Sequence, residues 1–178
     1  MVFQYNTIES GQLQIRSIPF DVQALCQSAI ADLSAKARAK NLELSVSVDA
    51  NVPQLAQGDP EQIKQVLTLL LDNAIKFTTQ GTINVSAQPA TTKARALEFA
   101  VTDTGCGISP ERLKTLQYPL SQIDSSLTHG AEGIGMGLTL AKQLVTLMGG
   151  WLEFQSKSGR GSTFRFTLPG DAAQSIAA

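Results

Sequence analysis

Residues 58–78, GDPEQIKQVLTLLLDNAIKFT, predict one long amphipathic helix. Asp59 can cap its N-terminus, Pro60 suits its first turn, and Gln62 stands where a capping-box partner stands. Apolar residues at helical spacing form the expected core stripe: Ile63, Val66, Leu67, Leu70, Ala74 and Phe77. An adjacent stripe at the edge of this core holds Gln65, Leu69, Asn73 and Lys76. A half-buried asparagine needs hydrogen-bond partners, so the question is what Asn73 and Lys76 face.

The flanking patterns predict strands and two further helices. Strands are expected at 12–17, 42–48, 81–88 and 96–103, and as a hairpin of WLEFQS and STFRFTLP around KSGRG. One helix follows the capping residue Asp21 and ends near 40–41, and another spans about 136–148. The long loop from Thr104 to about Ile134 is of a length that is usually functional or disordered. This mixture predicts an α+β two-layer sandwich, with a sheet of about five strands and three helices packed on one face.

The length of 178 residues suits one domain, which we expect at 12–169. Residues 1–11 read as the remnant of a preceding helical region or linker, and 170–178 as a disordered tail. The net charge is -1 and the sequence has no Lys/Arg run. Nucleic acid is therefore not an expected partner, because the sequence lacks a footprint for the phosphate backbone.

The two cysteines, Cys26 and Cys106, have neither CxxC spacing nor a nearby histidine. They are expected to be ordinary thiols in a reducing compartment. No apolar run approaches the ~20 residues of a membrane span, and the N-terminus lacks the pattern of a signal peptide. We therefore expect a cytoplasmic protein, or the cytoplasmic part of a parent anchored in the inner membrane.

The segment DTGCGIS (103–109) follows a predicted strand. Gly105 and Gly107 allow the backbone to approach a ligand closely. At the strand end, Asp103 can offer its carboxylate to a hydrogen-bond donor such as an exocyclic amine. Taken alone, the segment is equally compatible with a tight acidic turn.

The segment GIGMGL (133–138) opens the third predicted helix. Its glycines, Gly133, Gly135 and Gly137, expose N–H groups at the positive end of a helix dipole, which suits phosphate. The spacing is neither that of a dinucleotide fingerprint nor that of a P-loop. A glycine-rich hinge is the alternative for this motif alone.

Taken in order, these segments resemble the ATP-binding catalytic domain of sensor histidine kinases, whose fold is shared with gyrase, Hsp90 and MutL ATPases. The matching stretches are QVLTLLLDNAIKFT, DTGCGIS, SQIDSS, GIGMGLTLAKQLVTLMGG and GSTFRFTLP, and the resemblance covers about 12–169. The stretch SGQLQIRSIPFDV also resembles the join between the dimerisation helices of these kinases and this domain. The resemblance implies a mixed sheet and the cofactors ATP and Mg²⁺.

The resemblance implies a role for each matching position. Asn73 would bind Mg²⁺ and Lys76 would approach the phosphates. Asp103 would accept a hydrogen bond from the adenine N6 amine, and Thr163 would lie near the adenine. The remaining expected ATP-site residues are Phe77, Gly105, Gly107, Ile108, Gly133, Gly135, Gly137 and Leu138.

The sequence also departs from the family pattern. Leu69 stands where these kinases usually have a second asparagine, and where the related ATPases have a glutamate that activates water. Gln117 and Leu120 replace two phenylalanines of the lid, Glu132 replaces a glycine, and His129 stands where a basic residue is frequent. These departures bear on phosphotransfer more than on the fold.

His129 is the only histidine and lies in the lid, so the phosphoacceptor is expected on a helical dimerisation domain outside this chain. The leading hypothesis is a protein-histidine kinase fragment that supplies the γ-phosphoryl group to that histidine for signalling through a response-regulator receiver domain. The isolated domain would be a monomer. The alternative is a degenerate domain that acts as a regulatory binding module on another sensor kinase. A hydrolytic ATPase is disfavoured because Leu69 cannot activate water.

Overall fold

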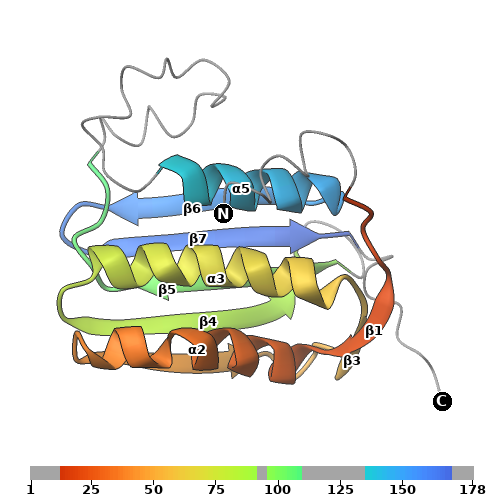
Figure 1. Ribbon diagram of the computed structural model, residues 1–178, viewed down its shortest axis with the longest axis horizontal. Helices are drawn as coiled ribbons and strands as arrows, with labels where there is room; N and C mark the ends of the chain where they lie inside the picture. Colours follow the sequence, from red (N-terminus) through yellow and green to blue (C-terminus); the bar gives the residue numbers. More distant parts are fainter. Residues whose placement is uncertain (1–12, 92–95, 110–134, 170–178) are drawn as a thin grey trace.

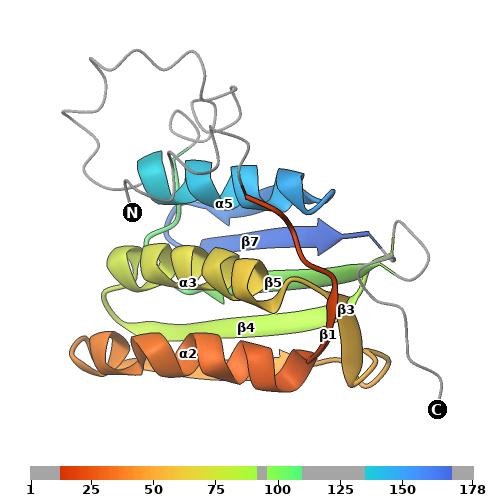
Figure 2. The same ribbon diagram turned by 45° about the vertical axis from the view of Figure 1, so that its right-hand side comes forward.

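The computed structural model describes residues 13–91, 96–109 and 135–169. The described residues form two layers, with three helices packed on one face of a sheet (Figures 1 and 2). The helices are α2 (Val22–Arg38), α3 (Pro60–Phe77) and α5 (Gly135–Leu147). Predictions for 1–11, 170–178 and most of the long loop lie outside the described residues.

The sheet has five strands in the order β2-β4-β5-β7-β6. Only β2 and β4 run parallel among these neighbours, and the other three pairs are antiparallel, so the predicted mixed sheet is confirmed. The strands are β2 (Leu42–Val48), β4 (Gly81–Pro89), β5 (Leu97–Asp103), β6 (Trp151–Lys157) and β7 (Gly161–Leu168).

Helix α3 forms as its sequence predicts. The Asp59 side chain accepts a hydrogen bond from the Gln62 N–H group at 3.2 Å, and Pro60 occupies the first turn. The buried stripe includes Leu71 and Ile75 in addition to the predicted positions, whereas Phe77 is only half buried. α3 lies between α2 and α5 over the middle of the sheet (Figure 1).

The core fills the space between the helices and the sheet. Its largest buried side chains include the stacked rings of Phe99 and Phe166, whose centroids are 5.2 Å apart. The opposite face of the sheet is polar: Asn84 bonds Ser45 and Ser47 across the β2–β4 pair. The alternation of apolar and polar residues therefore gives the sheet one covered face and one open face.

A second, two-stranded sheet was not predicted. It pairs β1 (Ile18–Asp21) with β3 (Leu55–Gly58) in antiparallel orientation. The predicted strand at 12–17 is wrong, because the described residues 13–17 have no regular structure and the strand instead contains Pro19. Pro19 is tolerated because each strand here is an edge strand.

Helix boundaries differ slightly from the predicted ones. α2 ends at Arg38, before the expected 40–41, and a turn with Asn41 in the left-handed region (φ 54°) leads into β2. Asparagine is one of the few residues besides glycine that adopt this conformation readily. α5 ends before Gly149, whose φ of 75° stops the helix as its sequence predicts.

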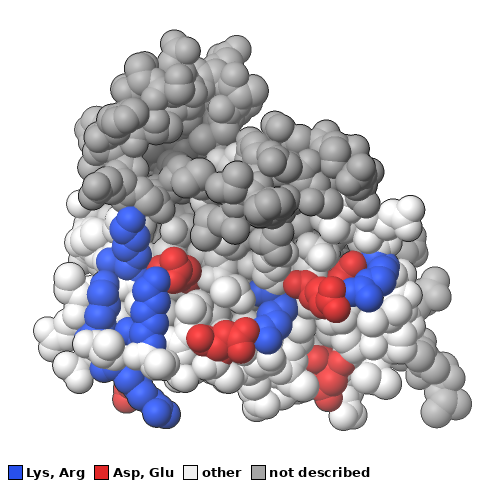
Figure 3. Space-filling model, viewed as in Figure 1, with Lys and Arg blue, Asp and Glu red and all other residues white. Residues whose placement is uncertain are grey.

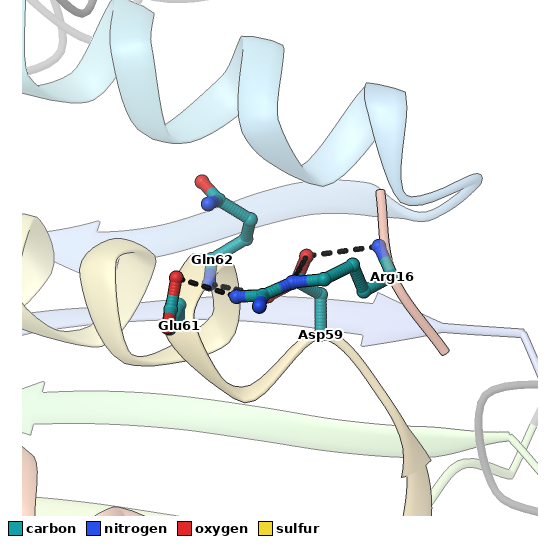
Figure 4. A network of polar contacts seen from close by, with 4 residues as sticks. All are labelled: Arg16, Asp59, Glu61 and Gln62. Carbon is teal, nitrogen blue, oxygen red and sulfur yellow. Dashed lines mark hydrogen bonds and ion pairs between the residues drawn. The ribbon is translucent and has the colours of Figure 1, made fainter. Parts of the chain in front are cut away.

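A polar network fastens the entry segment to the start of α3 (Figure 4). Asp59 Oδ2 accepts a hydrogen bond from the Arg16 backbone N–H at 2.9 Å. The Arg16 guanidinium lies 3.9 Å from the same oxygen and 2.6 Å from Glu61 Oε2. The capping carboxylate thus holds the helix and the segment before β1 together.

Candidate functional site

A cavity of about 290 Å³ opens where α3, the segment after β5 and the β6–β7 hairpin meet. Its size is near the lower end of the range for small-molecule sites. Both polar and apolar residues line it: Asn73, Ala74, Phe77, Asp103, Cys106, Gly107, Ile108, Ser109, Ser158, Ser162 and Phe164. Five of the predicted site residues, namely Asn73, Phe77, Asp103, Gly107 and Ile108, are therefore brought together.

Asp103 is the buried carboxylate of this cavity, with 6% of its surface exposed. Its Oδ1 accepts hydrogen bonds from the N–H groups of Gly105 at 2.8 Å and Ser162 at 3.3 Å. In the described part of the chain, no donor bonds Oδ2. Burial raises the pKa of Asp103, and the two backbone hydrogen bonds oppose this shift. A ligand that donates an N–H to Oδ2 would therefore stabilise the carboxylate.

Close packing explains the two glycines after Asp103. A Cβ atom on Gly105 would lie 2.6 Å from the carbonyl oxygen of Phe77 and 2.8 Å from Thr78 Oγ1. Gly107 has a φ of 67°, and its Cβ would lie 2.2 Å from the carbonyl oxygen of Lys157. Both positions need glycine because the chain runs directly against α3 and the β6–β7 hairpin.

The β6–β7 hairpin holds the glycine segment in place. The Gly159 N–H donates to the Cys106 carbonyl at 2.7 Å, and the Ile108 N–H donates to Ser156 Oγ at 2.8 Å. On the other side, the Cys106 N–H donates to the Phe77 carbonyl at 3.3 Å. The segment that carries the cavity wall is thus fixed to two elements far apart in the sequence.

Thr163, which was expected near the adenine, is not among the residues that line the cavity. Thr163 pairs with Thr102, and their hydroxyl oxygens lie 3.1 Å apart on the open face of the sheet. Its neighbour Ser162 pairs with Asp103 and lines the cavity. Because side chains alternate along a strand, a shift of one residue moves the side chain to the opposite face.

Asn73 is half buried at the edge of the cavity, as predicted, and lies near the start of α5. A Cβ atom on Gly137 would be 4.0 Å from Asn73 Nδ2 and 3.8 Å from Leu69 Cδ2. Gly137 is therefore beside the asparagine, although space alone does not require a glycine there. Leu69 lines a separate groove between helices, and Leu138 is buried in the core.

The other residues expected near the phosphates belong to the end of the molecule where α3 ends and α5 begins. α5 begins at Gly135, at the same end as the C-terminus of α3 (Figure 1), whereas Gly133 lies outside the described residues. Lys76 is exposed, with its Nζ 5.6 Å from the centroid of the Phe77 ring. The lid positions 117, 120, 129 and 132 also lie outside the described residues.

Basic residues gather at the C-terminal ends of α2 and α3 (Figure 3). Lys36 and Arg38 belong to the last turn of α2, and Lys76 to that of α3. Lys40 Nζ donates to the Ile75 carbonyl at 2.7 Å and the Lys76 carbonyl at 3.1 Å. Lys36 pairs with Asp72. Of these residues, Lys76 adjoins the cavity-lining Phe77, and its positive charge favours an anionic ligand there.

The donor set near the cavity fits a metal ion that arrives with a ligand. The described residues contain no cluster of three or more His, Cys, Asp or Glu side chains arranged to hold a metal ion. Asn73 offers a single amide oxygen. Mg²⁺ often takes one or two protein ligands and completes its shell with water and phosphate, so this environment suits Mg²⁺ carried by a nucleotide.

A family model described as "Histidine kinase-, DNA gyrase B-, and HSP90-like ATPase" matches residues 58–172. The match includes α3, all the residues that line the cavity and the β6–β7 hairpin. The chain belongs to this ATPase family. The resemblance inferred from DTGCGIS and GIGMGL is thereby confirmed.

Among curated relatives, the sensor protein GacS of Pseudomonas syringae pv. syringae is 38% identical over 169 residues, which cover 94% of this chain and 19% of GacS. The signal transduction histidine-protein kinase BarA of Escherichia coli K12 is 34% identical over 170 residues, covering 94% of this chain and 18% of BarA. This ATPase-family chain thus spans less than a fifth of the length of these sensor kinases.

Solved structures share the fold. Full-length ShkA in complex with AMPPNP superposes with a TM-score of 0.81 at 24% identity, covering 99% of this chain and 35% of that one. The catalytic domain of the histidine kinase ThkA in a nucleotide-free form gives a TM-score of 0.69 at 22% identity, covering 89% of this chain and 97% of that one. The predicted sandwich is therefore the fold of histidine kinase catalytic domains.

Six of the residues that line the cavity were not predicted as site residues: Ala74, Cys106, Ser109, Ser158, Ser162 and Phe164. Ser156, which contacts Ser162, was not predicted either. Strand pairing would have revealed Ser162, because it stands opposite Asp103. Separately, none of the helices in the described ranges is both long and apolar enough to cross a membrane.

Proposed function

We propose that the chain is the Mg-ATP-binding catalytic domain of a sensor histidine kinase. The observation that carries this proposal is the carboxylate of Asp103, buried in the cavity with one oxygen that no donor among the described residues bonds. An adenine amine is a suitable donor for that oxygen. In this arrangement the adenine lies against Asp103 and Ile108, and the phosphates extend past Asn73 towards the start of α5.

The residues expected to face the phosphates are suited to bind Mg²⁺ and negative charge. The amide oxygen of Asn73 would bind Mg²⁺, while the N-terminus of α5 and Lys76 favour the negative charge of the phosphates. Bound Mg²⁺ would neutralise charge that develops during phosphoryl transfer. Holding the nucleotide with its γ-phosphoryl group accessible is then the task of this chain's own residues.

The acceptor in this proposal is a histidine on a helical dimerisation domain outside this chain. A response-regulator receiver domain would then take the phosphoryl group, and the work would take place in the cytoplasm. The isolated domain would be monomeric, because dimerisation would belong to the missing helices. A sedimentation experiment that found a tight dimer would contradict this last point.

Calorimetric titration with ATP, with and without Mg²⁺, tests the nucleotide end of the proposal. We expect Mg²⁺ to strengthen ATP binding by the wild type and to have little effect on Asn73→Ala. Asn84→Ala is the matched control, since Asn84 lies on the open face of the sheet. An Asn73→Ala variant that keeps the full Mg²⁺ effect would refute the metal role of this residue.

A second function, a regulatory binding module on another sensor kinase, is favoured by Leu69. Its side chain offers no metal or water ligand one helical turn before Asn73. Transfer of radiolabelled phosphoryl from ATP to a separately supplied phosphoacceptor domain distinguishes the two functions. ATP binding without transfer, together with recovery of transfer in Leu69→Asn, would support the module. Transfer by the wild type would support the kinase.

A further inference from the structure

Three side chains form a row across the sheet at the floor of the cavity. Asp103 of β5 pairs with Ser162 of β7, and Ser162 pairs with Ser156 of β6. Directly paired residues point to the same face of a sheet, so all three face the helices. Ser162 is 7% exposed and lines the cavity beside Asp103. Ser156 is the next residue in the row and contacts Ser162 through its hydroxyl group.

Counting protons assigns the direction of each hydrogen bond in this row. Ser156 Oγ accepts from the Ile108 N–H at 2.8 Å, donates to the Gly161 carbonyl at 3.1 Å, and lies 2.8 Å from Ser162 Oγ. A serine hydroxyl carries one proton. Since the proton of Ser156 is donated to Gly161, the proton between the two serines comes from Ser162.

The reverse assignment satisfies fewer groups. If Ser156 donated to Ser162, the Gly161 carbonyl and Ser156 Oγ would face each other without a proton between them. A partly buried polar contact would then be lost. The first assignment therefore leaves Ser162 Oγ with lone pairs only towards the cavity, next to the carboxylate of Asp103.

We propose that Ser156 is a positioning residue for base selection. Ser156 accepts the hydroxyl proton of Ser162, so that Ser162 presents only lone pairs to a ligand. The site thereby selects an exocyclic amine over a carbonyl. This rests on the proposed function. An amine has two N–H groups and can satisfy both acceptors. A carbonyl at the same place would bring another acceptor against them, and a site with unmatched buried polar groups rejects such a ligand.

Competition binding of ATP and inosine triphosphate tests the proposal, because inosine has a carbonyl at the ring position where adenine has the amine, together with a protonated ring nitrogen beside it. The wild type should prefer ATP. In Ser156→Ala the Ser162 hydroxyl is free to rotate and donate to the carbonyl. We expect the preference for ATP to fall by about tenfold, mainly through tighter binding of inosine triphosphate.

Matched variants separate this role from simple support of the glycine segment. Ser156→Thr keeps the hydroxyl and should restore the wild-type preference. Ser162→Ala, alone or combined with Ser156→Ala, has no hydroxyl to donate and should show no gain for inosine triphosphate. Ser156→Cys fills similar space with a weak hydrogen-bonding group, and it replaces Ser156→Ala if that variant does not fold.

The outcomes are distinct. Equal weakening of both nucleotides in Ser156→Ala would overturn the inference and leave Ser156 as a support for Ile108. An unchanged preference would overturn it as well, while ATP binding by the wild type would leave the proposed function intact. A wild type that binds neither nucleotide would overturn both.

Discussion

Each end of α3 lies beside a buried aspartate, and the two aspartates differ in how they are partnered. Asp59, 2% exposed, accepts from the Gln62 N–H through one oxygen and from the Arg16 N–H through the other. Asp103, 6% exposed, accepts both of its hydrogen bonds through Oδ1. Both oxygens of Asp59 are hydrogen-bonded within the fold, whereas no donor among the described residues bonds Oδ2 of Asp103.

This difference indicates what each carboxylate is for. A buried charge is costly unless it is hydrogen-bonded or paired. Asp59 meets that requirement within the fold and has the guanidinium of Arg16 nearby, so it is structural. Among the described residues Asp103 is in no ion pair, and burial raises its pKa. The free-energy cost of burying the Asp103 charge is what we expect for a carboxylate that binds a ligand.

The largest expected effect on stability comes from Asp59→Ala. The variant loses the helix cap and leaves the Arg16 N–H without its acceptor, so the free energy of unfolding should fall by about 1 to 3 kcal/mol. Urea denaturation measures this. Asp59→Asn is the control, because it can still cap the helix and should lose less. Nucleotide binding at the far end of α3 should survive in the folded variant.

Removing the charge of Asp103 should act in the opposite direction. In Asp103→Asn the amide oxygen can still accept from Gly105 and Ser162, and the buried charge, which pairs with no cation among the described residues, is gone. The free energy of unfolding at neutral pH should therefore be unchanged or higher. If this variant were instead as unstable as Asp59→Ala, the contrast between the two carboxylates would be wrong.

A third effect follows from the raised pKa of Asp103. Between the ordinary carboxyl pKa and the raised value, the folded chain binds more protons than the unfolded chain. This contribution to stability is therefore present at low pH and is lost as the pH rises through that window. Affinity for an amine-bearing nucleotide should rise over the same window. Denaturation and calorimetry at several pH values, with Asp103→Asn as the reference, measure both trends.

The smallest effect is expected from Glu61→Gln. Glu61 and Arg16 are both substantially exposed, and exposed ion pairs contribute little. The change in the denaturation midpoint should be near the resolution of the measurement and should vanish in high salt. A loss comparable to that of Asp59→Ala would mean that the guanidinium, and not the backbone N–H, is the important partner of Asp59.

Local patterns were sufficient to predict the elements that carry the cavity. Asp59 and Pro60 predicted the start of α3, and the strand ending at Asp103 followed from its length and the glycines after it. The pair β1–β3 was missed because its strands have only four residues each and one contains Pro19. Short edge strands form through pairing with each other, which local periodicity does not report.

The partners within the cavity needed the sheet register. Thr163 and Ser162 are neighbours in sequence, yet only Ser162 stands opposite Asp103 on the helix side. Ser156 contacts Ser162 and Ile108 through hydrogen bonds that join three segments. No spacing rule predicts such contacts. The placement of Asn73 beside Gly137 likewise depended on how α3 and α5 pack.

The central claim is that Asp103 belongs to a nucleotide site, and calorimetric titration of ATP into the wild type and Asp103→Asn tests it most directly. We predict binding by the wild type and a loss of about tenfold to a hundredfold in the variant, because a hydrogen bond to a charged acceptor is removed. The thermal midpoint of the variant should not fall. Equal ATP affinity in two well-folded proteins would contradict the account.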